Sequence, residues 1–165
     1  MLDIRDVIGK EFLIFDGAMG TILQQRGLKA GEAPEIFNIE KPNIVLDIHN
    51  RYIEAGADII TTNTFGANEI KLKNTPYSVE KVVKAGVDIA RKASKGKFVA
   101  LDIGPTGQIL KPIGTLGFER AYDVFKRQII AGSNMGIDLI LIETMSDLYE
   151  MKAAILAAKE NTNLP

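Results

Sequence analysis

The sequence contains no cysteine and a single histidine among its 165 residues. Without cysteine it can form no disulfide and can hold no zinc through thiolates. Its 20 basic side chains are matched by 21 acidic ones, so neither nucleic acid nor an anionic membrane surface is expected as a partner. No apolar run approaches the ~20 residues of a membrane-spanning helix. The charged first residues do not resemble a secretory signal, and a cytoplasmic location is the default expectation.

Length and composition predict one domain with a core of its own. Apolar residues make up 46% of the sequence and charged residues 25%, which is ordinary for a folded protein. A chain of ~150 residues buries about 70% of the surface that is exposed in its unfolded form. We therefore treat residues 1–165 as a single domain.

Four short apolar runs repeat along the chain, each followed by a helical pattern. The runs are Phe12–Asp16, Asp58–Asn63, Phe98–Asp102 and Asp138–Glu143. Their first residues lie 46, 40 and 40 positions apart, and the second and fourth runs open with the near copies GADII and GIDLI. The runs are almost continuously apolar, as in parallel strands that are covered on both faces. The pattern predicts a repeated βα unit.

Apolar residues at helical spacing predict helices between these strands. Ser78 and Ser146 stand where N-caps are expected. Three glycines are predicted to end helices: Gly56, Gly96 and Gly136. Residues 43–55 form a further predicted helix, whereas residues 21–42 and 104–117 are predicted as long loops.

Four βα units in tandem fit two α/β architectures, an open doubly wound sheet and part of a (β/α)8 barrel. The sequence has no G-x-G-x-x-G dinucleotide motif, and Gly17–Thr21 after the first strand lacks the lysine of a P-loop. Long loops at the C-terminal ends of the strands favour the barrel. A complete barrel has eight units and about 250 residues. We therefore expect the N-terminal half of a (β/α)8 TIM barrel, truncated before the fifth strand.

Polar side chains stand at the end of every predicted strand. They are Asp16, Thr62 and Asn63, Asp102, and Glu143. In a barrel these side chains converge at one mouth, where three carboxylates could bind an ammonium group, hold a divalent cation or act as an acid and base pair. Carboxylates in such positions also cap helices or accept hydrogen bonds from loop amides, so each one has a structural interpretation as well.

The first strand is followed directly by Gly17, Ala18, Met19 and Gly20. Successive backbone amides at a turn between a strand and a helix suit a substrate carboxylate, but the same residues also suit a simple tight turn. The single histidine, His49, falls inside a predicted helix beside apolar residues. We expect a packed helix residue there rather than a catalytic base.

Four sequence blocks resemble the homocysteine S-methyltransferase family. They are DGAMGT from Asp16, HNRYIEAGADIITTNTFGA from His49, DIGPTG from Asp102 and IETMSDL from Ile142. They occur in the family's order and cover the chain from about Asp16 to Ala158. The amino-acid sequence of these blocks most resembles that of the N-terminal homocysteine-binding module of the cobalamin-dependent methionine synthases.

The resemblance implies a barrel that binds L-homocysteine and transfers a methyl group to its sulfur, giving methionine. It implies that Asp16 and Glu143 bind the substrate ammonium group and that the amides of Gly17–Gly20 bind its carboxylate. Asn63 and Asp102 would line or brace the pocket. In the family, zinc held by three cysteines from later strands activates the sulfur as a thiolate. In the cobalamin-dependent enzymes the methyl donor is methylcobalamin on another module, which a methyltetrahydrofolate module recharges.

The absence of cysteine is the main departure from the family. The zinc ligands are expected outside this chain, in a missing C-terminal half barrel, and the isolated chain is expected to be inactive. A homodimer through the open edges of two half barrels is one way to cover them. Two alternatives stay open: a divalent-metal-dependent TIM-barrel hydrolase or lyase that uses Asp16, Asp102 and Glu143, and a half barrel without catalytic activity.

Overall fold

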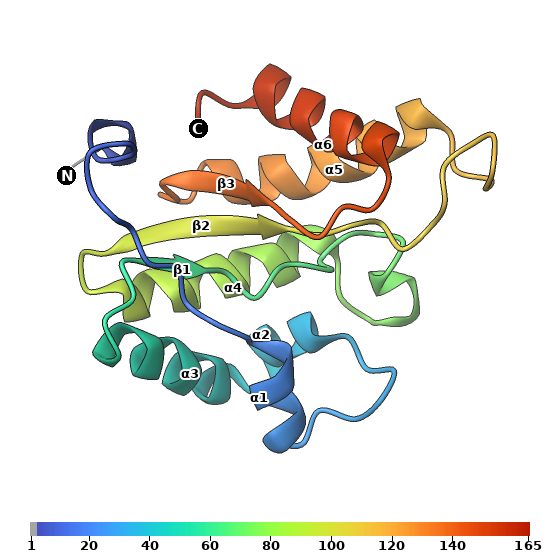
Figure 1. Cartoon of the computed structure of the whole chain (residues 1–165). Coiled ribbons are helices and arrows are strands. Elements are labelled where there is room, and N and C mark those ends of the chain that lie inside the picture. The colour runs from blue at the N-terminus through green and yellow to red at the C-terminus, as the bar shows by residue number, and fades with distance from the viewer. Residues whose placement is uncertain (1–2) are drawn as a thin grey trace.

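The computed structural model describes residues 3–165 and has a three-stranded parallel sheet at its centre (Figure 1). The strands are β1 (Ile59–Thr61), β2 (Phe98–Ile103) and β3 (Leu139–Ile142), in the order β1-β2-β3. All three lie inside or within one residue of predicted strands. The α/β class and the parallel pairing are therefore confirmed.

Helices connect the strands and cover one face of the sheet (Figure 1). The α-helices are α1 (Gly20–Gln25), α2 (Phe37–Glu40), α3 (Pro42–Glu54), α4 (Val79–Ser94), α5 (Phe118–Ser133) and α6 (Leu148–Asn161). Three short 3-10 helices are η1 (Ile4–Asp6), η2 (Pro34–Ile36) and η3 (Leu72–Asn74). No helix in the described part of the chain combines the length and the apolar character needed to cross a membrane.

The predicted first strand, Phe12–Asp16, is not a strand of this sheet. Its ladder is a single parallel bridge between Phe15 and Ile59, and the side chain of Phe12 is 100% exposed. The segment lies at the sheet edge, where only one neighbouring strand is available to bond its backbone. The prediction of four strands is thus corrected to three strands and one bridged edge segment.

The predicted helix ends are mostly confirmed. Ser78 caps α4, because its hydroxyl accepts a hydrogen bond from the Lys81 amide at 3.3 Å. Ser146 does not cap α6; the next residue, Asp147, accepts from the amides of Tyr149 and Glu150 instead. Three predicted stop glycines have positive φ, as their positions require: Gly56, Gly96 and Gly136.

The two predicted loops have different outcomes. Residues 104–117 form an irregular loop with one bridge between Leu110 and Leu116, as expected. The prediction for residues 21–42 is wrong, because they contain most of α1, together with η2 and α2. These elements are short, and helices shorter than about 12 residues depend on packing rather than on a visible period.

Side chains alternate across the sheet and so separate its two faces. Ile60 in β1 and Val99, Leu101 and Ile103 in β2 pack against α4 and α5 in the main core. The opposite face holds a second cluster: Ile4, Ile59, Ala100 and Leu139. Asp102 has the same parity as Ala100 and therefore belongs to that opposite face, at the C-terminal end of β2.

The near-copy strand openings have the same hydrogen bonds. Asp58 Oδ2 accepts from the Ile14 amide at 3.2 Å, and Asp138 Oδ2 accepts from the Val99 amide at 2.7 Å. Each carboxylate also pairs with a base, Asp58 with Lys97 and Asp138 with Arg91. The aspartate that opens one strand thus bonds the backbone of the preceding segment in both copies. The sequence repeat is a structural repeat.

Asp138→Ala should lower the free energy of unfolding by about 1–3 kcal/mol, because it leaves the Val99 amide without its acceptor. The matched control is Asp88→Ala, which breaks only an exposed ion pair with Lys84 inside α4 and should cost less than about 0.5 kcal/mol. Urea denaturation followed by circular dichroism measures both. Equal losses would contradict the role assigned to Asp138.

Candidate functional site

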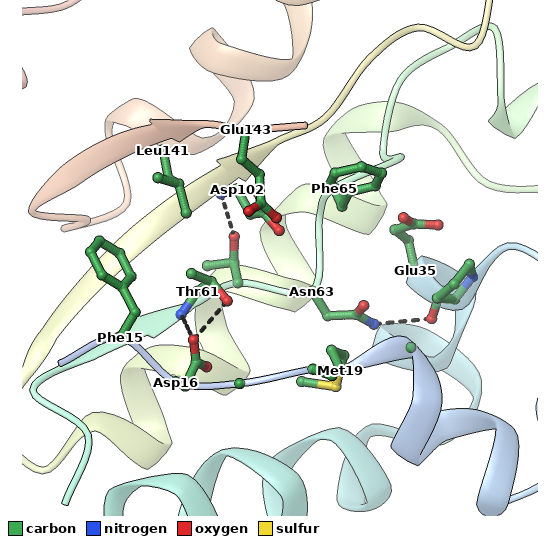
Figure 2. A pocket seen from close by; sticks show the side chains of 15 residues that line it. Phe15, Asp16, Met19, Glu35, Thr61, Asn63, Phe65, Asp102, Leu141 and Glu143 are labelled. Carbon is green, nitrogen blue, oxygen red and sulfur yellow. Dashed lines mark hydrogen bonds between the residues drawn. The ribbon is translucent and has the colours of Figure 1, made fainter. Parts of the chain in front are cut away.

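A cavity of about 550 Å³ opens at the C-terminal ends of the strands (Figure 2). All eight residues predicted for the site line it: Asp16, Gly17, Ala18, Met19, Gly20, Asn63, Asp102 and Glu143. They come from four segments that are far apart in the sequence. The structure brings these residues together, whereas their part in binding stays a prediction.

Asp16 is held rigidly at one wall of this cavity. Its Oδ1 accepts hydrogen bonds from the Thr61 amide at 3.0 Å and from the Thr61 hydroxyl at 2.8 Å (Figure 2). Its side chain is 2% exposed, and the Nδ1 atom of buried His49 lies 3.8 Å from its Oδ2. His49 is thus a packed residue of α3, as predicted, and it lies beside Asp16 without a hydrogen bond to it among residues 3–165.

The segment after Asp16 is pressed against α3. A Cβ at Gly17 would lie 2.9 Å from the Tyr52 hydroxyl, so a larger residue would push the two apart. The Tyr52 hydroxyl donates to the carbonyl of Ala18 at 2.9 Å. The absence of a side chain at Gly17 therefore lets the backbone pass close to Tyr52 along the cavity wall before it enters α1 at Gly20.

Asn63 braces the wall more than it faces a ligand. Its Nδ2 donates to the carbonyl of Pro34 at 3.0 Å and to Asn38 Oδ1 at 2.9 Å. Asn38 Nδ2 in turn donates to the Asn63 carbonyl at 2.7 Å. These bonds fasten η2 and α2 to the end of β1. Asn63 thus lies in the cavity wall and is bonded to its neighbours there, whereas its part in substrate binding stays a prediction.

Asp102 is buried, and its carboxyl group is not satisfied. The residue is 7% exposed, and its Oδ1 has no hydrogen-bond partner within residues 3–165. Burial raises the pKa of Asp102 to about 8, with further contributions from the negative charges of Glu143, Asp16 and Glu35. At neutral pH this carboxyl is therefore mostly protonated in the empty cavity.

A fourth acidic residue, Glu35, lines the cavity without having been expected there from the sequence. It stands in η2, within the stretch predicted as a loop, and it is 3% exposed. Its Oε1 accepts from the Gly66 amide at 2.6 Å, and burial raises the pKa of its carboxyl. Thr62, one of the strand-end residues expected at the mouth, also lines the cavity. The lining residues that were not expected there are Phe15, Pro34, Thr61, Phe65 and Leu141.

The ionisable residues that line the cavity are all acidic. Among the described residues, the 15 that line it include four acidic ones and no lysine, arginine or histidine. Such a site favours a cationic group. No set of three or more His, Cys, Asp and Glu side chains in residues 3–165 is placed to hold a metal ion. Together with the lack of cysteine, this arrangement does not fit a zinc centre and does not favour the divalent-metal alternative.

The sequence matches a family whose description is Homocysteine S-methyltransferase, over residues 13–165. The chain belongs to this family. It is 32% identical to a methionine synthase of Mycobacterium tuberculosis and 31% identical to one of Mycobacterium leprae, over 95% of its own length in each case. It spans only 14% of the length of these two relatives.

Solved structures of the family member MmuM, a homocysteine methyltransferase from Escherichia coli, have the same fold. The oxidised form gives a TM-score of 0.82 at 22% identity and the metallated form 0.81 at 21%. The alignments cover 95% of this chain and 61% and 62% of those chains. The α/β architecture of this chain is thus that of part of a homocysteine methyltransferase.

In this family member, replacing Asp102 by Asn should change the pH dependence of stability. A carboxyl whose pKa is raised on folding stabilises the protein at low pH, and that contribution is lost as the pH rises from about 4 towards 8. Asp102→Asn should therefore match the wild-type chain near pH 4 and exceed its free energy of unfolding by about 5 kcal/mol at pH 8. Urea denaturation across this range measures the difference, and a constant difference would contradict the burial argument.

Proposed function

We propose that the cavity binds the amino-acid end of L-homocysteine, and that the chain is the homocysteine-binding part of a methionine synthase type methyltransferase. The observation that carries the proposal is the composition of the cavity wall. Four acidic side chains and no basic one surround the space beside Gly17–Gly20. An amino acid presents an ammonium group and a carboxylate close together, and this wall offers complementary groups to each.

Asp16 and Glu143 would bind the ammonium group. Asp16 is fixed by two hydrogen bonds from Thr61 to its Oδ1. Its Oδ2 has no hydrogen bond among residues 3–165, and His49 Nδ1 lies 3.8 Å from it. Glu143 follows β3, and its side chain is exposed at the cavity rim, so it can adjust to a ligand. A rigid and a mobile carboxylate on opposite sides can enclose one cation through charge-assisted hydrogen bonds.

The substrate carboxylate would bind to the backbone amides of Gly17–Gly20. The four acidic side chains repel a carboxylate, and the cavity has no basic side chain to attract one. Backbone amides are therefore the donors left for it, and they stand where the chain turns into α1 at Gly20.

The transfer of the methyl group needs chemistry that these residues do not supply. Likeness to methionine synthases supports methylcobalamin as the proposed donor, recharged from methyltetrahydrofolate, and zinc bound by other residues as the activator of the sulfur. The residues that would hold these groups are expected outside this chain, which has no cysteine and spans 14% of the length of those relatives. A homodimer through the open sheet edges also stays a proposal.

Glu143→Gln should weaken L-homocysteine binding about 10-fold, because an amide of the same shape cannot pair with the ammonium charge. Glu54→Gln is the matched control, since Glu54 is exposed at the end of α3 and does not line the cavity. Isothermal titration calorimetry measures both. The proposal fails if the wild-type chain shows no binding at millimolar L-homocysteine, an outcome that would favour a half barrel without this function.

The isolated chain should not methylate homocysteine when free methylcobalamin is the donor. A thiol is a weak nucleophile at neutral pH unless it becomes a thiolate, and the 165 residues offer no thiolate-bound zinc. Methionine formation followed by mass spectrometry tests this, with a complete methionine synthase as the positive control. Turnover by the purified chain would refute it.

A further inference from the structure

The backbone of Asp102 is held by hydrogen bonds, whereas one oxygen of its carboxyl group has no hydrogen-bond partner among residues 3–165. Its amide donates to the Thr62 hydroxyl at 3.1 Å, and its carbonyl accepts from the Thr64 hydroxyl at 2.8 Å. The residue is 7% exposed, its Oδ1 has no partner within residues 3–165, and its side chain lines the cavity (Figure 2). These bonds fix the backbone of Asp102 at the point where its side chain enters the cavity.

Every charged group that faces Asp102 is acidic. Glu143 follows β3, Asp16 precedes α1, and Glu35 belongs to η2. From α5, on the other side of the strand, the neutral amide of Gln128 approaches the Asp102 carbonyl at 3.4 Å. No lysine, arginine or histidine is among the lining residues, so only the backbone of Ile103 favours the charged form of Asp102 against burial and three acidic neighbours.

We propose that binding of a ligand's ammonium group in this cavity releases a proton from the Asp102 carboxyl, so that Asp102 makes affinity for the ligand rise with pH. The identity of the ligand in this proposal rests on the proposed function, whereas the protonation of Asp102 without a ligand does not. The exchange is balanced: the O–H bond of the carboxyl breaks, its proton passes to solvent, and the carboxylate then faces the ammonium charge.

The proposal fixes the direction and size of the pH effect. A pKa of about 8 in the empty cavity means that the proton must be removed before or during binding at any lower pH. Affinity should then rise about 10-fold between pH 6 and pH 7 and level off above pH 8. About one proton should be released for each ligand bound at pH 7.

The state of Asp102 can be measured without any ligand. In the chain labelled with ¹³C at aspartate carboxyl groups, NMR titration should show one aspartate with a midpoint above pH 7. That resonance should be absent from Asp102→Asn, whose circular dichroism spectrum checks that it folds. If every aspartate titrates below pH 5, the proposal is overturned whatever the chain binds.

Ligand binding is then tested by calorimetry in two buffers of different ionisation enthalpy, with L-homocysteine and with propylammonium as a bare cationic head. We expect proton release with the wild-type chain and with Glu54→Gln, and none with Asp102→Asn. Because the ligand's own ionisation is common to all three, the difference reports Asp102. If homocysteine fails to bind while propylammonium releases the proton, the proposed function falls and this proposal stands. If propylammonium binds without proton release, or not at all, the proposal is overturned.

Discussion

The parallel register of the three strands is the constraint on which the site depends. Asp102 stands opposite Leu141 in the β2–β3 ladder. Glu143, two residues after Leu141, has the same parity and directly follows the C-terminal end of β3. Alternation of side chains sends both residues to the face away from the helices. A shift of one residue in this register would move Asp102 into the apolar core under α5.

The same face shows why the site is costly to build. Ile59, Ala100 and Leu139 make its N-terminal part apolar, and this apolar surface adjoins a buried carboxyl at the C-terminal part. Desolvation disfavours the charged form of Asp102, which lowers stability at neutral pH. Packing on the helix side offsets that cost, since the core there combines four sheet residues with the apolar stripes of α4 and α5. Stability and binding chemistry are thus assigned to opposite faces of one sheet.

Sequence reasoning succeeded where a period or a strand end marks the position. Apolar runs located the three strands, and the polar residues at their ends, such as Asp102 and Glu143, line the cavity as a group. It failed where tertiary packing decides. Glu35 lies in a short helix without a period, and Phe12–Asp16 has the composition of a strand but only one neighbour to bond. Neither the place of Glu35 in the cavity nor the single neighbour of Phe12–Asp16 can be inferred from the residues close to them in the sequence.

In the edge segment, the carboxylate of Asp16 has a structural function that the carboxylate of Glu143 does not have. Its amide donates to the Ile59 carbonyl at 2.9 Å and its carboxylate accepts from Thr61, so Asp16 itself continues the pairing that the missing ladder would provide. A change at Asp16 would therefore disturb the sheet edge as well as the cavity. The amide of Glu143 likewise donates to a neighbouring strand, at the Ile103 carbonyl 3.1 Å away, but its carboxylate has no hydrogen bond to the sheet among residues 3–165. For this reason a loss of binding in a Glu143 variant reports recognition of the ligand, whereas the same loss at Asp16 would combine recognition with the position of the edge segment.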